Sequence, residues 1–308
     1  MSFKTNKKSF GGSALLLLAA MIWGFAFVAQ RSGSAHLGAF AFNGIRFMMG
    51  ALSLIPVVLI FEKDKPDKKK IMDTVKYGAL AGAILCTASA FQQIGVEITQ
   101  SAGKAGFITG LYTVLVPIVT FVLYRRRNSF NVWIGAVIAV VGLLLLSIAD
   151  DFTIGFGDLV LLCGALFYTF HIIVIDRIVD RVSPLKFSMV QFFTCSVLNL
   201  IIGLFVDSYS LEAIGASMIP LLYTGICSAG IGYTLQVVAQ KNVPPTPASI
   251  IMSTESMFSV VGGALIMNET MTARGYVGCA LMFCGIILAQ LDLRKNGRNN
   301  GGTYEGNV

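Results

Sequence analysis

The sequence is poor in charged residues and has almost no histidine. Of its 308 residues, 13% are Asp, Glu, Lys or Arg, and 55% are hydrophobic. Soluble domains carry about 25% charged residues, so this chain has too few to cover a globular surface in water. Its mean hydropathy of +0.75 predicts a polytopic helical membrane protein. With only two histidines, a zinc site is not expected.

Two kinds of chemical motif are also missing. No two of the six cysteines form a CxxC pair, and each lies in an apolar segment, which favours small buried residues over redox or metal chemistry. These cysteines are Cys86, Cys163, Cys195, Cys227, Cys279 and Cys284. The chain has no Walker A sequence, so we do not expect it to hydrolyse ATP. We predict no catalytic residue, no metal and no cofactor.

The net charge of +7 does not indicate a nucleic-acid partner. The basic residues form short clusters between apolar runs, whereas a nucleic-acid interface would gather them in one patch. Lys4, Lys7 and Lys8 precede an apolar run over residues 14–29, as in a signal peptide. A copy of this segment recurs later in the chain, so we do not expect it to be cleaved.

Apolar stretches predict ten membrane spans, because about 20 residues are needed to cross roughly 30 Å of hydrocarbon. The predicted spans are 13–31, 37–61, 72–93, 101–124, 130–149, 157–179, 184–206, 214–239, 246–267 and 273–291. Short connections leave no room for a soluble domain. The Gly- and Asn-rich tail, 292–308, is predicted to be a disordered cytoplasmic segment.

Charge predicts the orientation of the spans. With ten spans both termini lie on one side, and this side then holds all Lys and Arg residues except Arg31, Arg46, Lys104 and Arg274. The acidic residues of the opposite side are Glu97, Asp150, Asp151, Asp158, Asp207, Glu212 and Glu269. The positive-inside rule therefore predicts cytoplasmic termini and a multi-pass protein of the plasma membrane.

The chain resembles itself when it is shifted by about 145 residues. This shift aligns Gly12 with Gly157, Trp23 with Tyr168, Phe42 with Phe187, and Phe47 with Phe192. Later in each half the shift is 143, aligning Gly135 with Gly278 and Gly142 with Gly285. Each half, 13–149 and 157–291, therefore holds five spans. An odd number of spans inserts the second copy in the opposite sense, the inverted-repeat arrangement of alternating-access transporters.

Four segments carry a resemblance to a known family. They are "MIWGFAFVAQ" (21–30), "FNGIRF" (42–47), "SAGKAGFITGLYTVLVPI" (101–118) and "STESMFSVVGGALIMNE" (253–269). Together they resemble the EamA family of the drug/metabolite transporter superfamily. The resemblance implies an all-α fold of ten transmembrane helices, arranged as two inverted five-helix repeats around a substrate cavity. It also implies export of amino acids, related metabolites or toxic compounds.

Two departures from the family pattern leave the substrate class open. Span four ends in "RRRNS" (125–129), where the family often has an acidic residue. Ser256 follows Glu255, where family members often have proline.

Polar side chains within the spans are the candidate substrate contacts, because they are costly in hydrocarbon and must face inward or pair. Trp23, Phe27 and Gln30 follow at i, i+4 and i+7 and share one helix face. That face either lines a cavity or packs an aromatic residue beside an interfacial amide. Tyr168 occupies the position of Trp23 in the second half, and His171 on the same face is either a functional group or a packing residue.

Two ionisable residues lie deep in predicted spans. Arg46 is near the middle of span two, where it either forms a buried ion pair or faces the substrate. Glu255 is the only acidic residue deep in an apolar span. We predict that it is an ion-coupling site for a proton or another cation. The alternative is a structural pair with Arg46 or Lys104.

Further amides, hydroxyls and one amine complete the predicted substrate-binding set: Gln92, Gln93, Lys104, Thr109, Tyr112 and Gln236. Such a set suits a zwitterionic or amphipathic solute. Small residues recur four apart, at Gly78 and Gly82 and again at Gly225 and Ala229, and predict close helix packing. Pro117 interrupts span four and is a candidate hinge.

These observations predict a secondary transporter that exports amino acids or similar small metabolites by alternating access. Its expected partners are a small-molecule substrate, protons or another cation, and the lipid bilayer, with no nucleic acid. Alternative readings are a multidrug or quaternary-amine transporter, a membrane-embedded enzyme, and a sensor or assembly partner that transports nothing.

Overall fold

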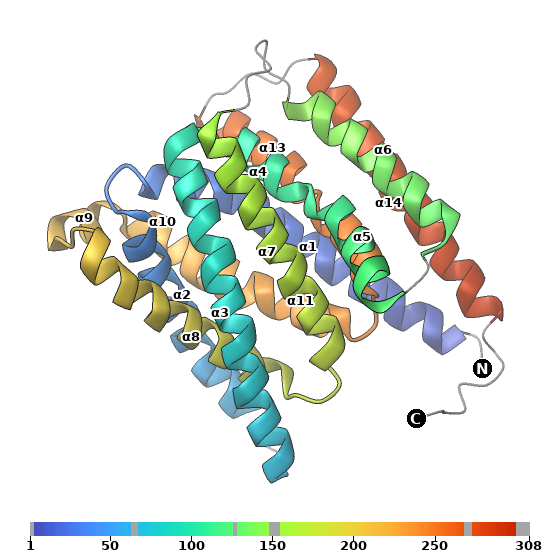
Figure 1. The fold of residues 1–308 in the computed structure, drawn as a ribbon, viewed down its shortest axis with the longest axis horizontal. Helices are drawn as coiled ribbons and strands as arrows, with labels where there is room; N and C mark the ends of the chain where they lie inside the picture. The colour runs from blue at the N-terminus through green and yellow to red at the C-terminus, as the bar shows by residue number, and fades with distance from the viewer. Residues whose placement is uncertain (1–2, 63–66, 126–127, 148–154, 268–272, 300–308) are drawn as a thin grey trace.

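A computed structural model describes residues 3–62, 67–125, 128–147, 155–267 and 273–299. Within these ranges all regular secondary structure is helical (Figure 1). The first half forms α1 (Phe3–Gly33), α2 (Ala39–Phe61), α3 (Lys68–Thr99), α4 (Ala102–Gly110), α5 (Tyr112–Tyr124) and α6 (Phe130–Ser147). The second half forms α7 (Phe156–Ile178), α8 (Pro184–Val206), α9 (Leu211–Ala216), α10 (Met218–Leu222), the π-helix η1 (Tyr223–Tyr233), α11 (Thr234–Gln240), α12 (Pro245–Met252), α13 (Glu255–Met267) and α14 (Ala273–Asn299).

Some residues used in the sequence analysis lie outside this description. Asp150, Asp151, Glu269 and positions 126–127 are outside the described residues, as are the side chains of Lys4, Lys7, Lys8 and Cys279. Helix α14 continues to Asn299, into the segment that was predicted to be a disordered tail, and residues 300–308 are not described.

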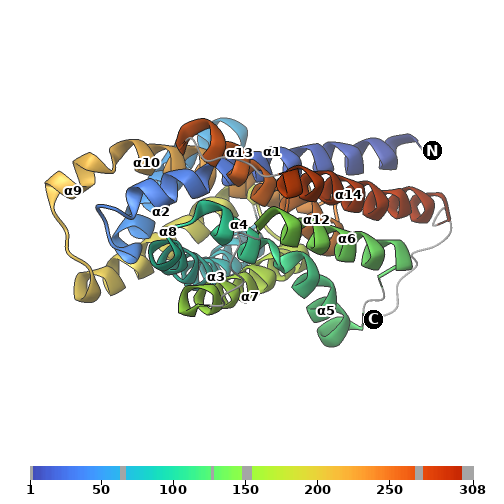
Figure 2. The same cartoon turned by 90° about the horizontal axis from the view of Figure 1, so that it is seen from above.

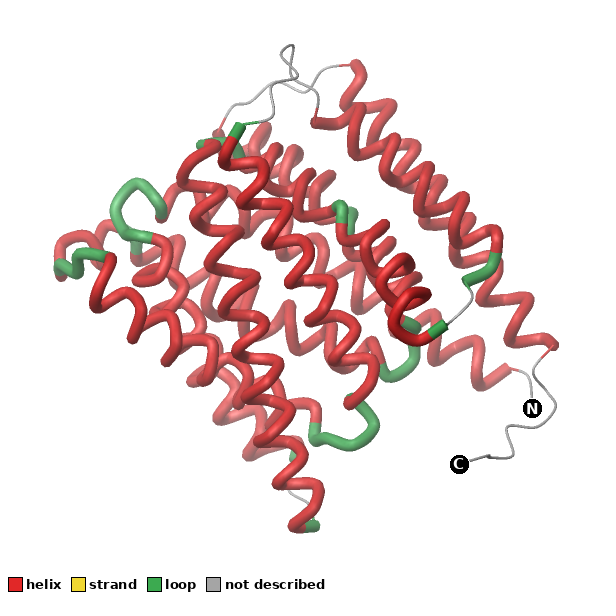
Figure 3. Tube along the Cα trace, viewed as in Figure 1, coloured by secondary structure: helices red, strands yellow, loops and turns green. Residues whose placement is uncertain are grey.

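Local signals in the sequence start several of these helices. Ser101 caps α4, since its Oγ accepts a hydrogen bond from the Lys104 backbone N–H at 3.2 Å. Pro184 stands at the first position of α8, where its missing N–H costs nothing. Asp158 lies in the first turn of α7 and accepts a hydrogen bond from the Gly155 backbone N–H at 2.8 Å. Where the connections are described, short loops join consecutive helices of the bundle (Figure 3).

The helix boundaries repeat along the chain. Helix α8 begins and ends 145 residues after α2. Helices α12 and α13 begin 143 residues after α4 and α5, and α14 begins 143 residues after α6. The two shifts are those at which the sequence resembles itself, so the duplication extends to the positions of the helix ends.

Eight helical stretches among the described residues are long and apolar enough to cross a membrane. They are Phe10–Gly33, Ala39–Phe61, Lys68–Thr99, Ala102–Tyr124, Phe156–Ile178, Pro184–Val206, Met218–Gln240 and Pro245–Met267. The predicted count of ten is therefore not established. The two remaining predicted spans correspond to α6, whose side chains are described without a gap only over Phe130–Gly142, and α14, many of whose side chains are not described.

Two of these stretches are broken near their middle, at corresponding positions. Leu111 separates α4 from α5, and residues 253–254 separate α12 from α13. Pro117 lies within α5, so the break in span four precedes the proline rather than coinciding with it. Proline withholds a hydrogen bond from the carbonyl four residues earlier, which weakens the helix on the side where the break occurs.

Corresponding helices of the two halves pack against each other. Helix α2 packs on α8 and α6 on α14, while α4 contacts α13 and, reciprocally, α12 contacts α5. Figures 1 and 2 show α6 and α14 side by side at one edge of the bundle. A Cβ on Gly142 would lie 2.6 Å from the Gly278 carbonyl oxygen, and one on Gly285 would lie 2.6 Å from that of Gly135. Such reciprocal contacts characterise an approximate two-fold relation.

Small residues allow the other close crossings, as their spacing predicts. A Cβ on Gly82 of α3 would lie 2.7 Å from the Thr194 Cβ of α8. A Cβ on Gly50 of α2 would lie 2.8 Å from the Ala229 Cβ of η1. The largest buried cluster lies where these helices converge, and it includes Leu16, Phe47, Leu85, Tyr112, Tyr168 and Phe192.

Candidate functional site

A cavity lies at the centre of the bundle, between the two halves. Its empty space is about 450 Å³, including its opening to solvent. The predicted residues that line it are Trp23, Phe27, Gln30, Arg46, Gln92, Thr109, Tyr112, Tyr168, His171, Gln236 and Glu255. Lining residues that sequence reasoning missed are Ala26, Ile172, Ser228, Tyr233 and Met252. Of the predicted substrate-binding residues, Gln93 and Lys104 are outside this lining.

Corresponding positions of the two halves supply much of the cavity wall. The shift of 145 relates Trp23 to Tyr168, Ala26 to His171, and Phe27 to Ile172. The shift of 143 relates Thr109 to Met252 and Tyr112 to Glu255. Both halves therefore present the same helix faces to one shared space, and the side chains on those faces differ.

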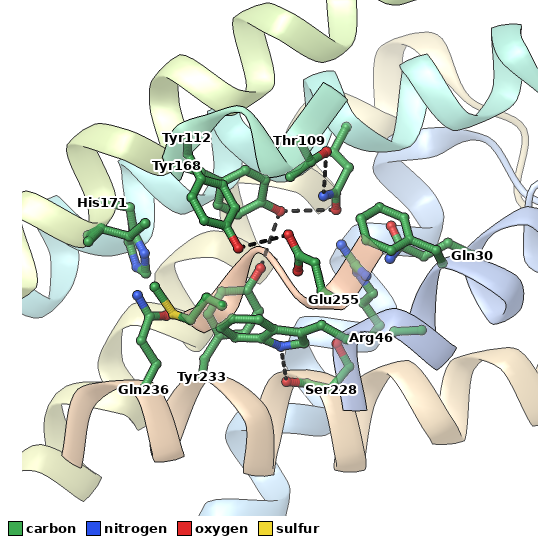
Figure 4. Close-up of a pocket in the computed structure, with 16 residues that line it drawn as sticks. Gln30, Arg46, Thr109, Tyr112, Tyr168, His171, Ser228, Tyr233, Gln236 and Glu255 are labelled. Atoms are coloured by element: carbon green, nitrogen blue, oxygen red, sulfur yellow. Dashed lines mark hydrogen bonds between the residues drawn. The ribbon is translucent and has the colours of Figure 1, made fainter. Parts of the chain in front are cut away.

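A chain of hydrogen bonds crosses the cavity wall (Figure 4). The Tyr233 hydroxyl donates to the Tyr168 hydroxyl oxygen at 3.2 Å, and the Tyr168 hydroxyl donates to Gln92 Oε1 at 3.1 Å. Gln92 Nε2 then donates to Thr109 Oγ1 at 3.3 Å. The chain links η1 and α7 of the second half to α3 and α4 of the first, so it orients these side chains across the junction.

Glu255 is the first residue of α13 and is 4% exposed. Its Oε1 accepts a hydrogen bond from the Tyr112 hydroxyl, the first residue of α5, at 2.9 Å (Figure 4). Neither predicted cationic partner is its ion-pair partner. Lys104 Nζ instead lies 2.8 Å from Asp158 Oδ2, which ties α4 to α7 outside the cavity lining.

Arg46 projects from α2 into the cavity wall and is 2% exposed. Its Nε and Nη2 atoms are buried and have no hydrogen-bond partner among the described residues. Its charge lies over two aromatic rings, with Cζ 4.9 Å from the centroid of Phe47 and 5.8 Å from that of Phe42. Ring faces attract a cation, but the donors Nε and Nη2 remain without an acceptor among the described residues.

The polar face of α1 meets η1 and α3. Trp23 Nε1 donates to the Ser228 carbonyl at 3.2 Å, and the Trp23 ring lies 4.8 Å from the Tyr233 ring. Gln93 of α3 stabilises α1 from outside the cavity lining, since its Nε2 donates to the Gln30 backbone carbonyl at 3.3 Å. Gln30 Oε1 is a buried acceptor without a partner among the described residues.

His171 and Gln236 line the other end of the cavity (Figure 4). His171 Nε2 lies 3.0 Å from Gln191 Oε1, and Gln236 Nε2 donates to Gln240 Oε1 at 3.0 Å. Tyr233 precedes Gln236 by three residues, so helical spacing alone could have identified it.

Ser228 precedes Tyr233 by five residues, the spacing of the i→i+5 hydrogen bonds of the π-helix η1. The α-helical period does not place these two residues on one face, and for this reason the pattern could not reveal Ser228. Among the described residues, including those of the cavity, no group of three or more His, Cys, Asp or Glu side chains could hold a metal ion.

Comparisons with known proteins agree with this architecture. The EamA-like transporter family matches the chain twice, over residues 10–148 and 155–291. An uncharacterized transporter of Archaeoglobus fulgidus is 27% identical over 90% of this chain and 84% of its own length. The uncharacterized transporter YoaV of Bacillus subtilis is 22% identical over 89% of this chain and 94% of its own length.

A solved structure, titled only as the crystal structure of a protein, has the same fold. Its TM-score is 0.74 at 16% identity, and the match covers 92% of this chain and 98% of that one. The two family matches span both halves of the helical bundle and enclose the cavity between them. The chain therefore belongs to the EamA-like transporter family and is a multi-pass membrane transporter of a small-molecule substrate.

Proposed function

We propose that the chain exports amino acids or similar small metabolites across the plasma membrane by alternating access. The observation that carries the proposal is the central cavity, where corresponding faces of both halves bring together a guanidinium, a carboxyl group, several amides and aromatic rings. Charged and amide groups suit the polar ends of an amino acid, and the rings suit its apolar part.

Alternating access follows from the duplication. We take each half, 13–149 and 157–291, as five spans, with α6 and α14 as the fifth span of each and both termini cytoplasmic. Five spans per half insert the second copy in the opposite sense, so that rocking one half against the other opens the cavity to each side in turn. The reciprocal packing of α2 on α8 and of α6 on α14 supports this relation.

The broken helices are suited to such a movement. Both breaks lie next to cavity residues, at Tyr112 and Glu255, and discontinuous spans commonly form the binding sites of secondary transporters. A hinge at Pro117 would act within α5, close to the first break.

Glu255 is the proposed site of ion coupling. It is a buried carboxyl group with a hydroxyl donor as its partner rather than a cation. Gain or loss of a proton there changes both the net charge of the cavity and the hydrogen bond that joins α13 to α5. Coupling of this kind would link proton movement to the relative position of the halves.

Flux measurements in proteoliposomes test the proposal. A proton gradient should accelerate the movement of a labelled amino acid by the wild-type protein. Glu255→Gln should lose this acceleration and retain exchange between equal concentrations, because exchange needs no net proton movement. A matched control is Glu212→Gln, which changes an exposed carboxyl group on α9. If Glu255→Gln keeps the full response to the gradient, Glu255 is not the coupling site.

A second candidate function, transport of quaternary amines, has one observation in its favour. Trp23, Tyr112, Tyr168 and Tyr233 all line the cavity, and clustered rings bind quaternary ammonium groups. Competition by tetramethylammonium in the same flux assay distinguishes the two candidates. An amino-acid exporter should be insensitive to it.

A further inference from the structure

We propose that Arg46 is the anchor for a carboxylate group of the transported solute. The cavity would then select small solutes that carry a carboxylate and would reject amines that lack one. This inference rests on the proposed function, because it takes the central cavity as the path of the solute.

The first argument is the state of the Arg46 side chain. It is almost completely buried, and two of its donor nitrogens, Nε and Nη2, have no hydrogen-bond partner among the described residues. A buried charge without a counter-ion is strongly unfavourable, and buried arginines are normally paired with a carboxylate. The described residues supply rings to Arg46 but no carboxylate within ion-pair distance. The missing partner is therefore expected to arrive with a ligand.

The second argument is geometric. The N–H of Nε and one N–H of Nη2 lie on the same edge of the planar guanidinium and point in the same direction. This edge is the fork that binds both oxygens of a carboxylate, with two parallel hydrogen bonds. The two unpartnered nitrogens are thus the pair that such a group requires. Arg46 lines the cavity, so the fork lies in the cavity wall, where its two nitrogens are buried in this conformation.

The third argument comes from the other half. The position corresponding to Arg46 is Gln191, whose Oε1 is already engaged by His171 at 3.0 Å. The cavity therefore has its guanidinium on one side only. Gln30 Oε1 and Gln236 Oε1 are buried acceptors without partners among the described residues, and both line the cavity. They can accept N–H groups from a solute whose carboxylate is held at Arg46.

Thermal unfolding of the purified protein in lipid nanodiscs tests the inference. The probes are the twenty amino acids, each compared with its amide and with the amine that lacks the carboxyl group. At least one amino acid should raise the unfolding midpoint, and its amide should bind at least about 30-fold more weakly, because a desolvated charge pair loses one partner. Arg46→Gln should abolish this preference for the acid.

Two further variants control the measurement. Arg177→Gln removes an exposed arginine at the end of α7, which lies over the Tyr124 ring, and should leave the preference unchanged. Arg46→Lys keeps the charge but loses the fork, so it should bind the acid more weakly than the wild type and still prefer it to the amide. The comparison of acid with amide on the wild-type protein needs no variant at all, so a misfolded Arg46→Gln would not prevent the test.

Three results would overturn the inference: equal affinity for acid and amide, a surviving acid preference in Arg46→Gln, or no amino acid that stabilises the wild type. Stabilisation by sodium chloride alone, lost in Arg46→Gln, would also overturn it, since Arg46 would then hold an inorganic anion. Failure of the proposed function is distinguishable from these results. A protein that binds acids through Arg46 but moves no solute in vesicles contradicts transport, whereas flux of a solute without a carboxylate contradicts only the role of Arg46.

Discussion

The first and second halves of the chain bring corresponding positions to the same cavity and fill them with different chemistry. The first helical residue after the break in span four is Tyr112, and the first one after the break in span nine is Glu255. The Tyr112 hydroxyl donates to the Glu255 carboxyl group, so the two corresponding residues contact each other across the junction. Both halves have this break in the backbone, but the side chains that follow it differ in chemistry.

A second pair of corresponding positions also differs between the halves. The second half has His171 and Gln191, and these two side chains lie 3.0 Å apart at His171 Nε2 and Gln191 Oε1. The first half has Ala26 and Arg46 at the corresponding positions. Alanine has no polar side-chain atom, so the first half cannot satisfy its own charged residue in this way. The first half therefore offers no polar side chain at this position to Nε and Nη2 of Arg46, which have no hydrogen-bond partner among the described residues.

The largest expected effect comes from substitutions at the crossing of α6 and α14, to which both halves contribute a corresponding glycine. Gly142→Leu and Gly285→Leu should each destabilise the protein by about 3 kcal/mol or prevent folding, because each side chain would collide with a backbone carbonyl of the facing helix. The midpoint of thermal unfolding and the yield of monodisperse protein measure this effect. The control is Gly215→Leu on α9, where a Cβ would meet nothing within 4 Å. Strongly unequal effects of the two substitutions would contradict a two-fold crossing.

An intermediate effect is expected when a tyrosine hydroxyl is removed from the cavity, and it should differ between Tyr112 of the first half and Tyr233 of the second. Tyr112→Phe removes the donor to Glu255 and should cost about 1.5–3 kcal/mol if the acceptor is charged. Tyr233→Phe removes a donor to a neutral hydroxyl, that of Tyr168, and should cost only about 0.5–1.5 kcal/mol. Both variants keep the ring, so packing is matched. Tyr112→Phe should also weaken the response of flux to a proton gradient, and the reverse order of the two variants would argue against a special role for the carboxyl group.

The sequence predicts the cavity well where it depends on the cost of polar groups in hydrocarbon. Trp23, Arg46 and Glu255 were identified because such residues are unusual within a span, and Tyr168 because it corresponds to Trp23 in the second half. All four line the cavity. The internal repeat likewise predicts which helices correspond. These signals are local, or depend on one shift along the chain, and a single sequence contains both.

Features that depend on tertiary contacts or on irregular helices were not predictable. Ser228 was missed because η1 is a π-helix, whose wider turn changes which residues share a face and cannot be recognised from α-helical spacing. The break at Leu111 was missed because Pro117 marks a disturbed helix without specifying where the helix yields. Lys104 was assigned to the substrate path because an amine within a span is costly, and its partner in α7 cannot be recognised from the sequence.

The smallest expected effect is that of a substitution at Lys104. It distinguishes a side chain that joins the two halves from one that binds the solute. Lys104 Nζ lies 2.8 Å from Asp158 Oδ2, and the Lys104 side chain is 39% exposed. The Asp158 side chain is only 9% exposed, but the glutamine of Lys104→Gln can still donate a hydrogen bond to it. The cost should therefore stay at about 0–1 kcal/mol, as for an exposed pair, with a slightly lower unfolding midpoint and unchanged solute affinity. Binding and thermal unfolding, measured alongside Arg46→Gln, check both statements. A loss of affinity comparable to that in Arg46→Gln would return Lys104 to the substrate path, because an ion pair between α4 and α7 cannot by itself discriminate between an acid and its amide.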